Sequence, residues 1–137
     1  NARHMTGGTP KYLISPPGAR MPLFPAKIDP IQASVILVEG IYDMINLHDK
    51  GLTNAVCCFG TRNINEEKLS ILRLQGIEEA IVFFDGDEAG QTAAAKVQEM
   101  CENVDLLTRN INVADIDPGV LTENQVEKLK NKLYKGV

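Results

Sequence analysis

From Val35 onward, short and nearly continuous apolar runs alternate with amphipathic segments, and this alternation predicts the elements of the chain. The runs SVILVEG, NAVCCFG and EAIVFF predict three strands, the first ending near Glu39 and the second closed by Gly60. A fourth strand is predicted at VDLLT, residues 104–108. Strands with so little polar alternation are typical of a parallel sheet that is buried on both faces.

Segments with a helical period separate these runs and follow the last of them. They predict helices over residues 41–50, 65–74 and 88–102, with glycines just past the first two. A final helix follows Thr122, which stands three residues before Gln125 in the spacing of a capping box. Together these elements predict an α/β fold with about four mainly parallel strands and helices on both faces.

The residue pattern of the chain changes near residue 34, from a proline-rich segment to alternating apolar and amphipathic runs, and this change predicts the domain organisation. We interpret residues 1–5 (NARHM) as an expression remnant, so that the rest would be an excised domain. Residues 6–34 hold six of the seven prolines and predict an extended segment that leads into the fold. Residues 35–137 form the predicted folded domain with its C-terminal helix.

Charge is divided unequally along the chain. The formal net charge is −4, but residues 1–30 carry about +3, so the folded body is strongly acidic. A domain that grips nucleic acid by itself usually has a basic face, so the body is better suited to binding cations. The three cysteines lack any CxxC spacing, and we expect buried free thiols rather than a zinc ribbon or disulfides. No apolar run is long enough to span a membrane.

Acidic residues follow two of the predicted strands. Glu39 follows the first strand, and Asp85 and Asp87 follow the third. Sites in open α/β sheets form beyond the carboxyl ends of the strands, so these side chains should share one edge. Clustered carboxylates repel unless a cation offsets them, and oxygen ligands without His or Cys favour Mg²⁺ or Mn²⁺.

The Asp85-Gly86-Asp87 stretch has other interpretations when it is taken alone. Asp-Gly is a common turn pair, and a turn is the simplest reading. An EF-hand loop is excluded because Lys96 stands where a bidentate Glu is required. A phosphatase-type site with Asp85 as nucleophile is disfavoured, because such a pair usually follows the first strand of its sheet.

The chain resembles the TOPRIM domain in the version found in bacterial-type (bacterial or phage) DNA primases. The resemblance is carried by VILVEGIYDMINLHDKGLTNAVCCFGT and AIVFFDGDEAGQTAAAK, and by the upstream KYLISPPGARMPLF. It covers roughly residues 10–120 and includes the Glu-Gly, the Asp-x-Asp and the DGDxAGxxAA pattern of these primases. It implies the TOPRIM fold, and residues 6–34 would be the end of the preceding primase subdomain.

The resemblance also implies roles for individual residues. Glu39, Asp85 and Asp87 match the catalytic metal-binding acids, and Asp43 and Asp117 match further metal ligands. The family often has Asp-Pro-Asp at the last of these, where this chain has Gly119 in place of the second acid. Residues near the nucleotide and template path match at Lys11, Tyr12, Gly60 and Thr61. The usual tyrosine after Glu-Gly is Ile41 here, and we interpret the displaced Tyr42 as a packing residue.

A function follows from the resemblance: metal-dependent nucleotidyl transfer that makes RNA primers on single-stranded DNA. The implied partners are the template, nucleoside triphosphates, the RNA primer and, through parts of the parent protein outside this chain, the replicative helicase. The implied location is the cytoplasm, at the nucleoid during replication, with no membrane association. A TOPRIM-type nuclease would use the same acids to hydrolyse phosphodiesters and stays open as the alternative. We expect the 137-residue chain alone to be inactive or nearly so.

Overall fold

A computed structural model describes residues 23–25, 27–60, 63–111 and 117–134. Its four strands are β1 (Ser34–Val38), β2 (Ala55–Cys57), β3 (Glu79–Val82) and β4 (Leu107–Asn110). They form one sheet in the order β2-β1-β3-β4, and every neighbouring pair is parallel. The four helices of the described residues are α1 (Ile41–Asp49), α2 (Glu66–Leu74), α3 (Glu88–Asn103) and α4 (Glu123–Leu133). The predicted α/β fold with a four-stranded parallel sheet is confirmed.

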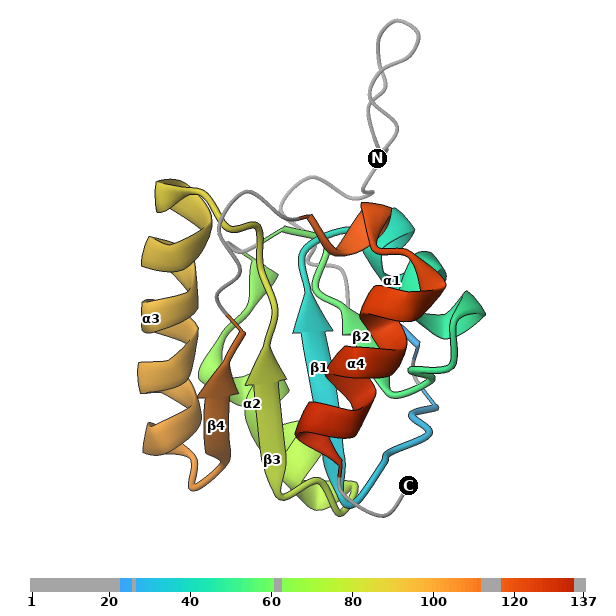
Figure 1. Ribbon diagram of the computed structural model, residues 1–137. Coiled ribbons are helices and arrows are strands. Elements are labelled where there is room, and N and C mark those ends of the chain that lie inside the picture. The colour runs from blue at the N-terminus through green and yellow to red at the C-terminus, as the bar shows by residue number, and fades with distance from the viewer. Residues whose placement is uncertain (1–22, 26, 61–62, 112–116, 135–137) are drawn as a thin grey trace, which may run out of the picture.

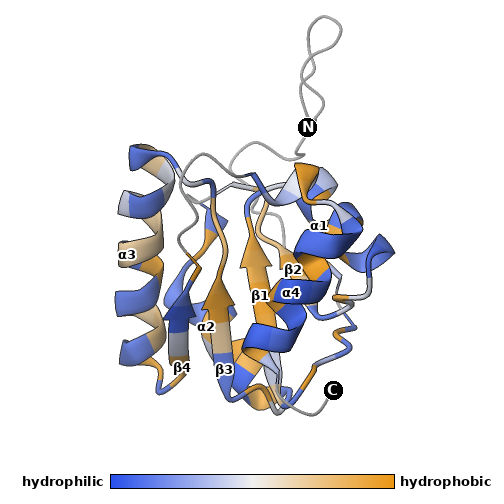
Figure 2. Cartoon of the chain, in the orientation of Figure 1, coloured by the Kyte–Doolittle hydropathy of each residue, from blue (hydrophilic) through white to orange (hydrophobic). Residues whose placement is uncertain are grey.

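Helices cover the sheet on both faces because successive strand residues point to opposite sides (Figure 1). Val35 and Leu37 of β1 belong to a buried cluster that includes α2 and α3. Ile36 and Val38 belong to a second cluster, which includes α1 and α4. The apolar colouring of β1 and β3 between two helical layers in Figure 2 agrees with this division. Each fully buried aliphatic side chain of this kind stabilises the fold by about 1.5–3 kcal/mol.

The fourth strand lies later in the chain than its apolar pattern predicts. Helix α3 runs to Asn103, Val104 caps it, and Asp105 takes a left-handed backbone angle of φ 65°. The strand therefore starts at Leu107, and of the two adjacent leucines only Leu106 is buried, while Leu107 is 69% exposed. Leu107 belongs to neither of the two buried clusters described above, so apolar character is a poor guide to the position of this edge strand. The third strand also ends earlier than predicted, at Val82.

The predicted starts of α2 and α4 are confirmed, and in both a side chain caps the first turn of the helix. Thr122 and Gln125 form the expected capping box at the start of α4. Asn65 accepts a hydrogen bond from the Lys68 backbone at the start of α2. None of the helices in the described part of the chain is long and apolar enough to cross a bilayer. Residues 1–22 lie outside the described residues, so the expression remnant, the extended segment and the domain boundaries stay predictions.

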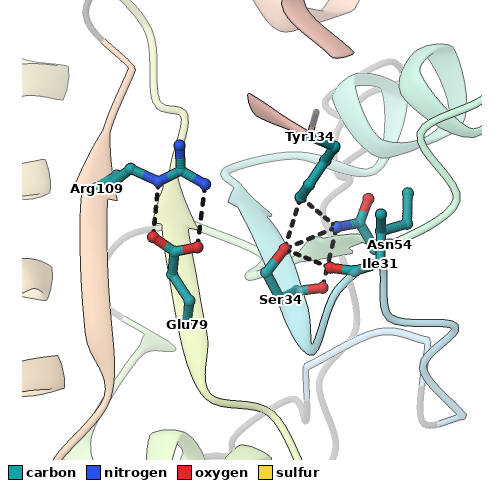
Figure 3. Close-up of polar contacts among 6 residues, drawn as sticks. All are labelled: Ile31, Ser34, Asn54, Glu79, Arg109 and Tyr134. Atoms are coloured by element: carbon teal, nitrogen blue, oxygen red, sulfur yellow. Dashed lines mark hydrogen bonds and ion pairs between the residues drawn. The ribbon is translucent and has the colours of Figure 1, made fainter. Parts of the chain in front are cut away.

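A buried polar network fastens the end of α4 to the sheet (Figure 3). The Tyr134 hydroxyl lies 2.6 Å from the Ser34 hydroxyl and accepts a hydrogen bond of 2.8 Å from the Asn54 amide nitrogen. Ser34 also donates to the Ile31 carbonyl at 2.9 Å, and the Asn54 amide donates to the Ser34 carbonyl at 3.0 Å. Ser34, Asn54 and Tyr134 are all buried. Their polar atoms therefore depend on one another, because water cannot replace a lost partner.

A second polar contact in Figure 3 joins the edge strand β4 to its neighbour β3. The Arg109 guanidinium on β4 donates two hydrogen bonds to the Glu79 carboxylate on β3, at 2.6 and 3.0 Å. Such paired contacts are geometrically specific, but the Arg109 side chain is 43% exposed. Its contribution to stability is therefore modest, and it mainly fixes the register of the edge strand.

We expect Tyr134→Phe to destabilise the domain by about 1–2 kcal/mol, because it leaves buried groups of Ser34 and Asn54 without a partner. Urea unfolding followed by circular dichroism measures the change. The matched control is Tyr42→Phe, which removes the same hydroxyl from a side chain that is 75% exposed. Equal midpoints for the two variants would show that the network does not hold α4.

Candidate metal centre

The carboxyl ends of the central strands meet at one edge of the sheet, as the sequence predicts. Glu39 directly follows β1 and Asp85 lies just beyond β3. The Glu39 carboxylate oxygen Oε1 accepts a hydrogen bond of 3.1 Å from the Asp85 backbone N–H. The loop after β2 joins the same edge, because the Gly60 N–H donates to the Glu39 carbonyl at 2.8 Å. Gly60 has a φ of 94°, which favours glycine at this turn.

Asp43 lies in the first turn of α1, four residues after Glu39. Its Oδ2 accepts a hydrogen bond of 3.2 Å from the Gly40 backbone N–H, which orients the side chain toward the strand edge. A negative charge is favourable at this end of a helix, so the local structure stabilises Asp43 without any ligand. The question is therefore whether other carboxylates reach it.

Asp43, Asp85 and Asp117 converge in the folded structure. One carboxylate oxygen from each lies within 4.8 Å of the others, although Asp117 follows Asp43 by more than seventy residues. Asp117 caps the 3₁₀ turn η2 (Pro118–Val120), where its Oδ1 accepts a hydrogen bond of 2.8 Å from the Gly119 N–H. Three carboxylate oxygens this close together are of the type that a hard divalent cation binds.

Burial, together with the charges of neighbouring carboxylates, raises the pKa of two carboxyls in the cluster. Burial raises the pKa of Asp43 to about 7, with a hydrogen bond and the charge of Asp117 as further causes. Burial also raises the pKa of Asp85 to about 6, helped by the charges of Glu39, Asp117 and Asp87. Burial and the three carboxylate charges all act on Asp85 in the same direction, and among the described residues no cationic side chain lowers its pKa. A bound cation would supply the missing positive charge.

Asp87 has a different local role from Asp85. It caps α3, and its Oδ1 accepts a hydrogen bond of 2.7 Å from the Gly90 N–H. A Cβ at Gly90 would lie only 2.2 Å from the Asp85 carbonyl oxygen, so the small residue is needed for this close approach. Neither Asp87 nor Glu39 belongs to the cluster of three, although the charge of each is close enough to affect Asp85. Their roles as catalytic metal ligands stay predictions.

Gly119, where the family often has a second acid, lies directly against the cluster. A Cβ at this position would be 2.8 Å from Asp43 Oδ1 and 3.4 Å from Asp117 Oδ1. A side chain here would therefore require the Asp43 carboxylate or the η2 backbone to shift. The absence of a side chain lets the η2 backbone, and Asp117 with it, come close to Asp43.

Other predicted residues are placed only in part. Lys11, Tyr12 and Thr61 lie outside the described residues, so their predicted roles near nucleotide and template stay predictions. The interpretation of Tyr42 as a packing residue is wrong, because its side chain is 75% exposed on α1. The displacement by one position turns it away from the core. Asn46 contacts η2 from α1, although neither the residue pattern nor the resemblance predicted a role for it.

In the absence of metal, the stability of the domain should fall as pH rises from about 4 through 7. The raised pKa of Asp43 means that the folded state holds a proton more tightly than the unfolded state, and this advantage is lost on ionisation. We expect Asp43→Asn in EDTA to flatten this dependence and to raise the melting temperature at pH 8 by roughly 2–5 °C. Asp49→Asn, an exposed change on the same helix, should behave like wild type. A steep fall that persists in Asp43→Asn would show that other groups cause it.

Relatives of known identity resemble this chain over most of its length. A DNA primase from Helicobacter pylori (strain J99) is 34% identical over 112 residues, which cover 77% of this chain and 19% of the primase. The chain therefore spans about a fifth of the length of the curated relatives it matches.

Solved structures share the fold. The zinc-binding and RNA polymerase domains of the Aquifex aeolicus primase match with a TM-score of 0.65 and 22% identity, covering 73% of this chain and 25% of that one. A DnaG primase catalytic domain bound to single-stranded DNA matches with a TM-score of 0.63 and 24% identity, covering 74% and 33%.

A family model for the TOPRIM domain matches residues 33–117. The matched range begins just before β1 and ends at Asp117, so it contains all the acids described above. The resemblance inferred from the Glu-Gly and Asp-x-Asp motifs is thereby confirmed, and this chain belongs to the TOPRIM domain family, with bacterial DNA primases among its relatives.

Proposed function

We propose that this chain is the TOPRIM part of a primase, which binds Mg²⁺ or Mn²⁺ and supports RNA primer synthesis on single-stranded DNA. The observation that carries the proposal is the convergence of Asp43, Asp85 and Asp117 at the carboxyl edge of the sheet. Membership of the TOPRIM family and the similarity to bacterial DNA primases support it. The nuclease alternative is not favoured, because the relatives from Helicobacter pylori and Borreliella burgdorferi are DNA primases.

The residues of the cluster fit a hard divalent cation. All three offer carboxylate oxygens, and no histidine or cysteine belongs to the group. Cys57 and Cys58 are buried in the core clusters, where burial raises the pKa of both thiols and disfavours the thiolate that a soft metal needs. The donor set therefore favours Mg²⁺ or Mn²⁺ over zinc.

The side chains of the site have distinct parts in the proposed reaction. Asp43, Asp85 and Asp117 would hold the cation, and Glu39 fixes the Asp85 backbone through the hydrogen bond at 3.1 Å. We further propose Glu39, Asp85 and Asp87 as the catalytic acids, with Glu39 and Asp87 reaching the cation or its water ligands. A bound divalent cation would neutralise charge on the triphosphate and lower the pKa of the attacking 3′-hydroxyl.

The negative charge of residues 31–137 suggests that other parts of the parent protein bind most of the template. A structural neighbour of this chain is a DnaG catalytic domain bound to single-stranded DNA, which supports a DNA template as partner. Since the body of this chain is acidic, we place most of the basic template surface in other parts of the parent protein. Nucleoside triphosphates, the RNA primer and the replicative helicase complete the proposed partners, and the cytoplasmic nucleoid is the proposed location.

Metal binding tests the site directly. Titration with Mn²⁺ followed by electron paramagnetic resonance should show at least about tenfold weaker binding in Glu39→Gln and in Asp85→Asn/Asp87→Asn, because each removes ligand charge. Affinity should also fall as pH drops from 8 to 6, since protons compete for Asp43 and Asp85, whose pKa values are about 7 and 6.

The control for charge alone is Glu99→Gln/Glu127→Gln, which removes two exposed acids from α3 and α4. This variant should bind Mn²⁺ as wild type does. If the site variants and the control bind equally well, the cluster is not the metal site.

A primer-synthesis assay tests whether this chain needs the rest of its parent protein for activity. With single-stranded template, Mg²⁺ and radiolabelled ribonucleotides, the 137-residue chain should make little or no RNA, because the proposed template surface is not part of it. The full-length parent serves as the positive control. Robust synthesis by the chain alone would contradict this expectation.

A further inference from the structure

Asp117 caps a short 3₁₀ turn whose internal hydrogen bonds do not fix its position relative to the rest of the fold. Turn η2 has three residues, and it is not part of the sheet. Its own hydrogen bonds are local: the Val120 N–H donates to the Asp117 carbonyl at 3.0 Å, and the Gly119 N–H donates to the Asp117 side chain. These bonds shape the turn, but they do not determine where the turn lies relative to Asp43.

Asn46 on α1 joins η2 to the helix that carries Asp43. Its amide nitrogen donates to the Pro118 carbonyl at 2.8 Å and to the Leu121 carbonyl at 3.1 Å. One side chain therefore binds the backbone at both ends of the turn. Asn46 stands three residues after Asp43, so both side chains project from neighbouring turns of one helix face.

The orientation of the Asn46 amide is itself fixed. The Lys50 ammonium donates to Asn46 Oδ1 at 2.5 Å, and Lys50 stands one helical turn further along. With its oxygen bonded to Lys50, the amide directs its two N–H groups at the carbonyls of Pro118 and Leu121. Both proton donors and the oxygen acceptor of this half-buried side chain are thus used.

Apolar contacts bring η2 near α1, but they are too permissive to set its position. Pro118 and Leu121 are buried, and Leu121 packs in the cluster that contains Met44 and Leu47 of α1. Hydrophobic burial is non-directional, whereas hydrogen bonds to two defined carbonyls have preferred lengths and angles. The η2 backbone lies close to Asp43 at Gly119, where a Cβ would be 2.8 Å from Asp43 Oδ1.

We propose that Asn46 is a positioning residue for the metal centre: it holds η2 against α1 so that Asp117 reaches the oxygens of Asp43 and Asp85. Asn46 does not belong to the carboxylate cluster and acts only through the backbone that carries Asp117. The inference deepens the proposed function and rests on it for the identity of the ligand. The two hydrogen bonds from Asn46 to the Pro118 and Leu121 carbonyls are present in the protein without metal.

A double-mutant cycle tests the inference through Mn²⁺ affinity. Asn46→Ala should weaken Mn²⁺ binding about tenfold, as is usual when a group that orients a metal ligand is removed. In an Asp117→Asn background, the same substitution should change affinity less than about twofold, because the ligand it positions is already lost. The control is Ile45→Ala, an exposed neighbour on α1, which should bind as wild type.

A second readout needs no metal. Hydrogen exchange followed by mass spectrometry should show about tenfold lower protection of residues 117–121 in Asn46→Ala, and unchanged protection of β1 and β3. A global loss of protection, or a wild-type pattern at residues 117–121, would overturn the proposal. So would an equal loss of affinity in both backgrounds, since Asn46 would then not act through Asp117.

The two readouts separate this inference from the proposed function. If wild type binds no Mn²⁺ but Asn46→Ala lowers the hydrogen-exchange protection of residues 117–121, the proposed function is wrong and the role of Asn46 in positioning η2 is supported. If Asp85→Asn weakens Mn²⁺ binding and Asn46→Ala does not, the metal site stands and the role of Asn46 fails.

Discussion

The structure is organised around the repulsion among carboxylates that the fold brings to one edge of its sheet. Asp43, Asp85 and Asp117 come from a helix, a strand end and a 3₁₀ turn, and bringing their charges together costs free energy. Burial raises the pKa of both Asp43 and Asp85, and the charges of neighbouring carboxylates raise the two pKa values further. Such an arrangement persists because the rest of the fold stabilises it and because a cation can offset it.

The stabilisation comes from a small number of directional contacts built on a rigid sheet. Parallel pairing of β1 with β3 sets the two strand ends side by side, and Glu39 bonds the Asp85 backbone across them. Capping by Asp87 and the close approach at Gly90 fix the start of α3 beside the same edge. Buried apolar residues on both faces of the sheet supply the free energy that these polar contacts require.

The C-terminal part of the domain completes the edge and links it to the far end of the fold. Turn η2 carries Asp117 and continues into α4, whose end is fastened to the sheet by the hydroxyl of Tyr134. Asn46 ties the beginning of this segment to α1. The position of Asp117 therefore depends on contacts at both ends of the segment that runs from η2 through α4.

Sequence by itself determined the layers of this protein and the chemistry of its edge. The apolar runs of β1, β2 and β3 and the helical periods between them predicted the sheet, because burial on both faces leaves so clear a pattern. Local motifs likewise indicated Glu39, Asp85 and Asp87 as acids at strand ends. The family resemblance added Asp43 and Asp117 as further acids. Only the tertiary structure decided the position of the edge strand β4, the exposure of Tyr42 and the close approach of Asp117 to Asp43. These depend on contacts between residues far apart in the chain, such as Asn46 with Pro118, and no local pattern of residues specifies the distance between two such segments.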